Sequence, residues 1–168
     1  MTAVATRGAA SRRHDGSRAA VGSPALLAAV FTLSTAAGGV HLALAEHHFE
    51  EWWLYGVFFV ATAAAQLIFA VLFLLPPTRP AFAVLGIAGN TAVLATYVMS
   101  RTTGVPVGWH AWTPEEVGVV DFGTAVAEVA LICCLLPFVP PRLRPWLVNV
   151  LFGCALVAVA LRLVGVLT

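Results

Sequence analysis

Long apolar runs separated by short polar breaks dominate this sequence, and they restrict what the chain can fold into more than any other feature. A hydrocarbon core about 30 Å thick is crossed by a helix of about 20 apolar residues. Five runs reach this length, at about residues 24–45, 53–75, 81–100, 116–139 and 146–168. The sequence therefore predicts an all-α fold, a polytopic membrane helix bundle with five transmembrane helices in one domain over residues 24–168.

The composition agrees with a membrane protein, because 60% of the residues are hydrophobic and only 10% are charged. Charged residues make up about a quarter of an ordinary soluble domain. We expect the lipid bilayer to surround the bundle, and we expect no nucleic-acid partner. Residues 1–23 differ, since they are rich in Arg, Ala, Gly and Ser and lack apolar periodicity, which predicts a disordered cytoplasmic tail.

A secretory signal is the rival interpretation of the first run. Arg12 and Arg13 precede the run, and Ala43-Leu44-Ala45 resembles a cleavage site. The run is longer than the apolar core of about 7–15 residues that a signal normally has, so a membrane-spanning helix is the preferred interpretation.

The arginines predict an orientation. All nine basic residues are Arg, and with a cytoplasmic N-terminus seven of them lie on the inner side, leaving Arg101 and Arg162 outside. Positive charge concentrates on the cytoplasmic side of membrane proteins. We therefore expect a bacterial plasma-membrane protein with its N-terminus cytoplasmic and its C-terminus extracytoplasmic. The same orientation places most acidic residues outside, namely Glu46, Glu50, Glu51, Glu115 and Glu116.

Two acids, Asp121 and Glu128, interrupt the fourth run. A charge near the middle of a bilayer costs at least ~2.5 kcal/mol, so such residues normally face a bundle interior, a partner or water. Seven helical residues return to within about 20° of the starting direction, which puts both acids on one stripe of the helix. Phe122 and Val126 fall on the opposite side, which suits lipid. The two acids are the first candidates for a binding site.

Other polar residues extend this candidate site across the bundle. His41 lies near the outer end of the first run, Gln66 and Asn90 lie at mid-membrane, and Arg101 ends the third run. The pattern predicts a polar column from the outer surface to the membrane centre. The candidate ligand-binding or ion-binding residues are Asp121, Glu128, His41, Gln66, Asn90 and Arg101, and no catalytic residue is predicted.

Three kinds of chemistry could use this column. Proton or ion handling would use Glu128 below Asp121. A divalent metal could take imidazole and carboxylate ligands, and the weak candidate set is His41, His48, Glu51 and Asp121. A structural role would have the acids pair with Arg101 or hydrogen-bond to Asn90 and Gln66, holding the helices together. A contact between an acid and Arg101 would favour this structural role.

Two stretches resemble a known group of proteins. One is His41 through HHFEEWWLYGVFF to Gln66, and the other is GN-x9-SRTTGVPVG followed by PEEVGVVD and Glu128. Over about residues 25–135 they resemble small multi-pass membrane proteins of high-GC Gram-positive bacteria that have no known activity. The resemblance implies only that the outer loops and the acidic helix recur in that group.

The leading hypothesis is an outward-facing site that binds or translocates a cation, a proton or a small solute. The second is a non-catalytic accessory or structural subunit of a membrane complex, with a homo-oligomer as one form of it. A metal-dependent membrane enzyme ranks third.

Overall fold

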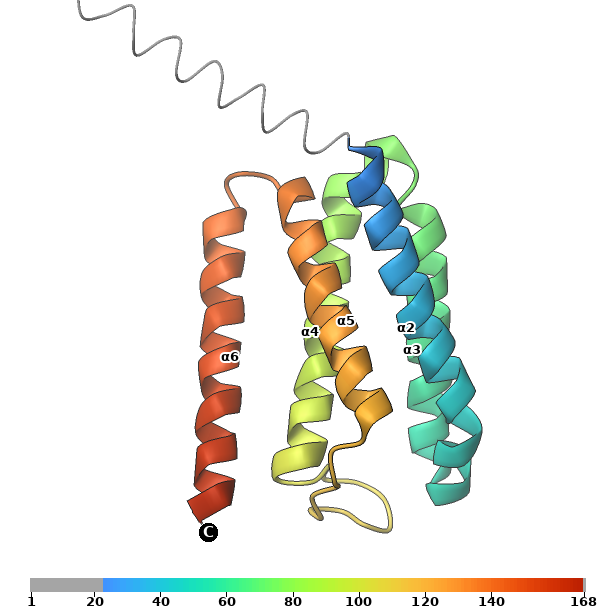
Figure 1. Ribbon diagram of the computed structural model, residues 1–168, viewed down its shortest axis with the longest axis vertical. Helices are drawn as coiled ribbons and strands as arrows, with labels where there is room; N and C mark the ends of the chain where they lie inside the picture. Colours follow the sequence, from blue (N-terminus) through green and yellow to red (C-terminus); the bar gives the residue numbers. More distant parts are fainter. Residues whose placement is uncertain (1–22, 168) are drawn as a thin grey trace, which may run out of the picture.

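The computed structural model describes residues 23–167, with side chains to Ala160 and at Leu163, and over this range the chain is helical without a strand (Figure 1). The helices are α2 (Pro24–Glu51), α3 (Trp53–Leu72), α4 (Arg79–Thr102), α5 (Val119–Leu135) and α6 (Arg144–Leu167), with short 3-10 turns η1 (Pro76–Thr78) and η2 (Leu136–Phe138). The predicted all-α class is confirmed. The predicted disordered tail lies outside the described residues, apart from Ser23.

Among the described residues, four segments are long and apolar enough to cross a membrane: Pro24–Glu51, Trp53–Leu72, Pro76–Thr102 and Val119–Phe138. They coincide with the first four predicted runs. Where its side chains are described, α6 contributes an apolar stretch from Arg144 to Ala160, which is shorter than a full span. The described part of the chain thus has four helices that could span a membrane, by their length and composition.

The helix bounds differ from the approximate predicted spans, most clearly at the end of α2 and also at the start of α5. α2 continues through residues 46–51, beyond the first predicted run, because nothing there breaks a helix before Trp52 turns to an extended conformation (φ −167°, ψ 136°). α5 begins at Val119 and not at 116, because the preceding residues belong to the outer loop. The Glu115 amide donates to the Ser100 carbonyl at 2.9 Å and holds this part of the loop against the end of α4.

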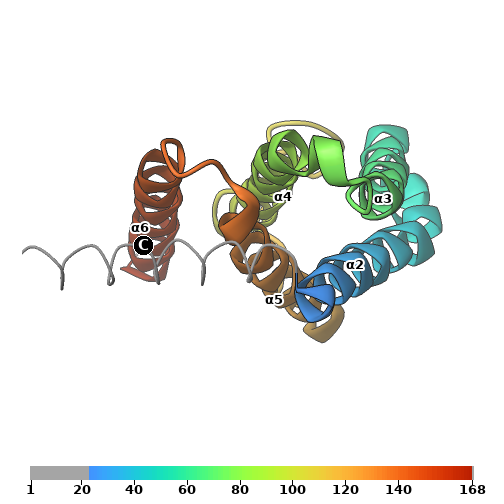
Figure 2. The same ribbon diagram turned by 90° about the horizontal axis from the view of Figure 1, so that it is seen from above.

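Successive helices run in opposite directions (Figure 1). Seen end-on, α2 packs against α3 and α5, α4 packs against α5, and α6 stands to one side against α4 (Figure 2). The turns after α3 and α5 lie at one end of the bundle, called here the arginine end after Arg79, Arg142 and Arg144. The α2–α3 junction and the outer loop, residues 103–118, lie at the other, called the glutamate end after Glu46, Glu50, Glu51, Glu115 and Glu116.

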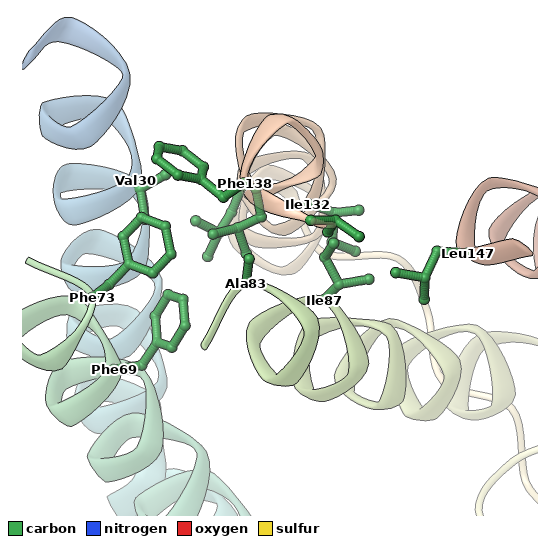
Figure 3. Close-up of a cluster of buried hydrophobic side chains, with 11 residues drawn as sticks. Val30, Phe69, Phe73, Ala83, Ile87, Ile132, Phe138 and Leu147 are labelled. Carbon is green, nitrogen blue, oxygen red and sulfur yellow. The ribbon is translucent and has the colours of Figure 1, made fainter. Parts of the chain in front are cut away.

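The apolar core fills the half of the bundle nearest the arginine end (Figure 3). The rings of Phe73 and Phe138 meet edge to face with centroids 4.9 Å apart. Gly86 allows α4 to approach closely, since a Cβ there would lie 2.6 Å from the Phe69 ring. The core residues are Val30, Phe69, Phe73, Ala83, Ile87, Leu131, Ile132, Leu135, Phe138, Val139 and Leu147.

Two arginines satisfy backbone carbonyls at the arginine end. Arg79 donates to the carbonyls of Phe73 (3.2 Å) and Leu74 (2.9 Å), just after α3. Arg144 donates to the carbonyls of Pro137 (3.0 Å) and Val139 (3.1 Å), at the end of η2. Carbonyls at helix ends lack partners within the helix, so these contacts stabilise both turns.

Candidate functional site

A cavity of about 270 Å³ lies between α2, α3, α4 and α5 in the half of the bundle nearest the glutamate end. Val105, Pro106 and Val107 of the outer loop form part of its wall. Side-chain exposure falls along the cavity, from 43% at Glu115 to 29% at Asp121 and 2% at Glu128. This gradient defines a mouth at the outer loop and a floor near the middle of the bundle.

A buried hydrogen-bonded group, called here the floor cluster, consists of His41, Gln66, Asn90 and Glu128. The Glu128 Oε1 atom lies 3.0 Å from His41 Nε2 and accepts a hydrogen bond of 3.2 Å from Gln66 Nε2. Gln66 Nε2 also donates to Asn90 Oδ1 at 3.3 Å, and Asn90 Nδ2 donates to the Gly86 carbonyl at 2.7 Å. Four predicted site residues from four helices therefore meet at one place.

The hydrogen bonds of the floor cluster assign roles to its atoms. An amide nitrogen only donates, so Glu128 Oε1 is an acceptor for Gln66. His41 Nε2 approaches the same oxygen, which assigns the ring proton to Nε2. His41 Nδ1 is then an acceptor in the neutral ring, and this buried atom has no hydrogen-bond partner among the described residues. Because His41 and Glu128 both line the cavity, this carboxylate–imidazole pair forms its floor.

A second charged group, called here the mouth cluster, consists of Arg101, Glu115 and Asp121. Arg101 donates to Glu115 Oε2 at 2.7 Å and to Asp121 Oδ2 at 2.8 Å, and its guanidinium lies 5.4 Å from the centre of the Tyr97 ring. These contacts join the end of α4 to the outer loop and to the start of α5. The contact between an acid and Arg101 favours a structural role for Asp121, whereas Glu128 pairs with His41 deeper in the bundle.

Two glycines shape the outer loop over the cavity. Gly104 and Gly108 have φ angles of 74° and 89°, which other residues rarely adopt. A Cβ at Gly108 would lie 2.5 Å from the Tyr55 hydroxyl oxygen, and this hydroxyl donates to the Val107 carbonyl. The loop is therefore held directly against α3.

The four weak metal candidates do not gather into one site. His48 Nδ1 lies 2.7 Å from Glu51 Oε2, His41 pairs with Glu128, and Asp121 pairs with Arg101. Among the residues that the structure describes, no group of three or more His, Cys, Asp or Glu side chains could hold a metal ion. The expected set rested on the mixture of imidazole and carboxylate ligands, and the structure pairs each of these side chains with another partner.

Sequence reasoning did not identify the walls of the cavity. They include four aromatic side chains, Tyr55, Phe58, Phe59 and Tyr97. A signal was present for three of them, since Tyr97 lies seven residues after Asn90, Phe59 seven before Gln66 and Tyr55 eleven before Gln66, all near-whole numbers of helical turns. Phe122 and Val126, on the side of α5 opposite the two acids, are 58% and 52% exposed and point away from the other helices.

No family model matches the chain, and neither a curated protein nor a solved structure matches it. Fold and site alone define the class: over residues 23–167 the protein is an all-helical bundle with four helices of membrane-spanning length and a polar-floored cavity between them.

Proposed function

We propose that this is a plasma-membrane protein that binds a small solute from the extracytoplasmic side, with Glu128 and His41 as the polar groups at the floor of the cavity. The observation that carries the proposal is a carboxylate–imidazole pair, 98% and 92% buried at its side chains, facing a cavity. Ionisable residues inside membrane spans are costly and usually functional. A purely structural pair would need no cavity beside it.

The proposal includes a topology in which α6 is a fifth span and the arginine end is cytoplasmic. It is supported by the position of Arg79, Arg142 and Arg144 at one end of the bundle and of the five glutamates at the other. The mouth of the cavity then opens to the cell exterior.

Binding is better supported than passage through the bundle. The apolar core, with Phe73, Leu131 and Leu135 fully buried, fills the space between the floor cluster and the arginine end. A polar solute that reached Glu128 would meet no polar path beyond it in this conformation.

The test is thermal unfolding of the purified protein in detergent with a panel of small cations, anions and neutral molecules. A ligand present at 100 times its Kd stabilises the folded state by about 2.7 kcal/mol. We expect one chemical class to raise the unfolding temperature, and we expect Glu128→Gln to weaken its binding at least tenfold. Glu46→Gln makes the same change on the exposed face of α2, outside the cavity, and should bind normally. Stabilisation by no class, or equal stabilisation of both variants, would contradict the proposal.

A second candidate function is that of an accessory subunit, and the packing of α6 favours it. This helix lies beside α4, away from α2 and α3 (Figure 2), and exposes Trp146, Phe152 and Leu156 at 64%, 65% and 55%. A partner in the membrane could cover this surface. Purification in a mild detergent would support this role if a second protein co-purified in fixed ratio, and a single chain alone would contradict it.

A further inference from the structure

The cavity combines aromatic walls with a carboxylate floor. Tyr55, Phe58, Phe59 and Tyr97 line its sides, and the Phe59 ring packs edge-on against His41 with centroids 5.4 Å apart. The face of an aromatic ring attracts a cation, by about 0.5–2 kcal/mol when the cation is within about 6 Å. The walls would therefore favour both an apolar body and a positive charge.

The charges that line the cavity are predominantly negative. Glu115, Asp121 and Glu128 contribute three carboxylates, whereas Arg101 contributes one guanidinium. The net charge of the lining is therefore −2 when His41 and His48 are neutral. Other glutamates, Glu46, Glu50, Glu51 and Glu116, surround the same end of the bundle. A cleft that is lined by charges of one sign and has low-dielectric walls concentrates ions of the opposite charge.

The chemistry of the walls distinguishes an organic cation from an inorganic one. A hard metal ion needs about six oxygen ligands, and the described residues offer no group of three or more ionisable ligands for it. Tyr55, Phe58 and Val93 would leave most of its surface against hydrocarbon. An amine with an apolar hydrocarbon part fits both the floor and the walls of the cavity. Its ammonium group would contact the Glu128 carboxylate, and its hydrocarbon part would pack against the aromatic rings.

We propose that the bound solute is a small protonated amine, with its ammonium group at Glu128 and His41 and its apolar body along the aromatic walls. This inference rests on the proposed binding function. The N–H groups of the amine would donate to the Glu128 carboxylate, which lines the cavity and lies 3.0 Å from His41 Nε2. A cavity of about 270 Å³ lies at or below the low end of pockets for drug-sized ligands, about 300–1,000 Å³, so the amine is small.

The experiment compares matched probes on the wild-type protein by thermal unfolding and by calorimetry. The probes are primary alkylammonium ions from methyl to hexyl and benzylammonium, each with its neutral alcohol, together with benzoate and benzyltrimethylammonium. We expect at least one ammonium to bind tenfold or more tightly than its alcohol, and benzoate not to bind. We also expect benzyltrimethylammonium, which has no N–H, to bind less tightly than benzylammonium.

The outcomes separate the two proposals. If an alcohol binds as tightly as its ammonium, or if benzoate binds best, the cavity is a binding site but the amine inference is wrong. If neither these probes nor the wider panel stabilise the protein, the binding function fails as well. Glu128→Gln should abolish the preference for ammonium over alcohol while Glu46→Gln keeps it. The wild-type comparison decides the question even if Glu128→Gln does not fold.

Discussion

Glu128 is a buried acid whose carboxylate is stabilised by hydrogen bonds from neighbouring helices. Its Oε1 atom receives hydrogen bonds from two helices, through His41 Nε2 and Gln66 Nε2, and its side chain is 2% exposed. Gln66 is central to this arrangement because one amide nitrogen serves both Glu128 and Asn90. A buried acid costs several kcal/mol without such partners, so the floor cluster depends on Gln66.

Gln66→Leu removes this donor and keeps a side chain of similar size. We expect the free energy of unfolding to fall by about 1–3 kcal/mol, because polar contacts inside membrane proteins contribute about 0.6–1.7 kcal/mol each and two are lost. Thr96→Val is the control, since the Thr96 hydroxyl bonds only to the Ala92 carbonyl within α4, and it should change stability by less than about 0.5 kcal/mol. Denaturant titration in detergent measures the free energy of unfolding of both variants. Equal stability of Gln66→Leu and wild type would show that the floor cluster does not hold the helices.

At the level of the helices, close packing of α4 against α3 and α5 depends on a single glycine. Gly86 lies opposite Phe69 and Leu135, whereas Gly89, one turn away on the same helix, has no neighbour that a Cβ would meet within 4 Å. Small residues at such contacts are the usual means of packing membrane helices.

Gly86→Ala and Gly89→Ala form a matched pair on this helix. At position 86 the new Cβ would lie 2.6 Å from the Phe69 ring and 2.9 Å from Leu135 Cδ1, so we expect a loss of about 1–3 kcal/mol from overpacking. At position 89 alanine should leave the free energy of unfolding unchanged or raise it by up to about 1 kcal/mol, because alanine favours the helix more than glycine does. Thermal unfolding of both variants checks this, and a result in which position 89 is the more damaging would contradict the observed packing.

The helices could be predicted from the sequence because apolar runs of membrane-spanning length are a local signal, and the stripe on α5 followed from helical geometry alone. The pairing of side chains could not be predicted in the same way. His41 meets Glu128 and not Asp121 because α2 lies beside α5 with a particular rotation and depth, and these are properties of the assembled bundle. For the same reason the pairing of Arg101 with Asp121 was only one of several alternatives, and its contact with Glu115 was not predicted.

As a whole, the molecule has two unlike halves. The half at the arginine end is packed with apolar side chains and closed by Arg79 and Arg144, and the half at the glutamate end holds the cavity. Glu128 and His41 lie between them. This division agrees with the proposed binding function, in which a solute would enter at the glutamate end and stop at the floor cluster.

Thiol labelling of intact cells with a membrane-impermeant maleimide tests this account most directly. In a variant whose native cysteines, Cys133, Cys134 and Cys154, are replaced by alanine, single cysteines are placed at the adjacent positions 125 and 126 of α5. Ala125 lines the cavity, whereas Val126 is 52% exposed on the side expected to face lipid. We predict that Ala125→Cys reacts from outside the cell and that Val126→Cys does not. Labelling of neither position, or of Ala125→Cys only after the membrane is permeabilised, would contradict an outward-opening cavity.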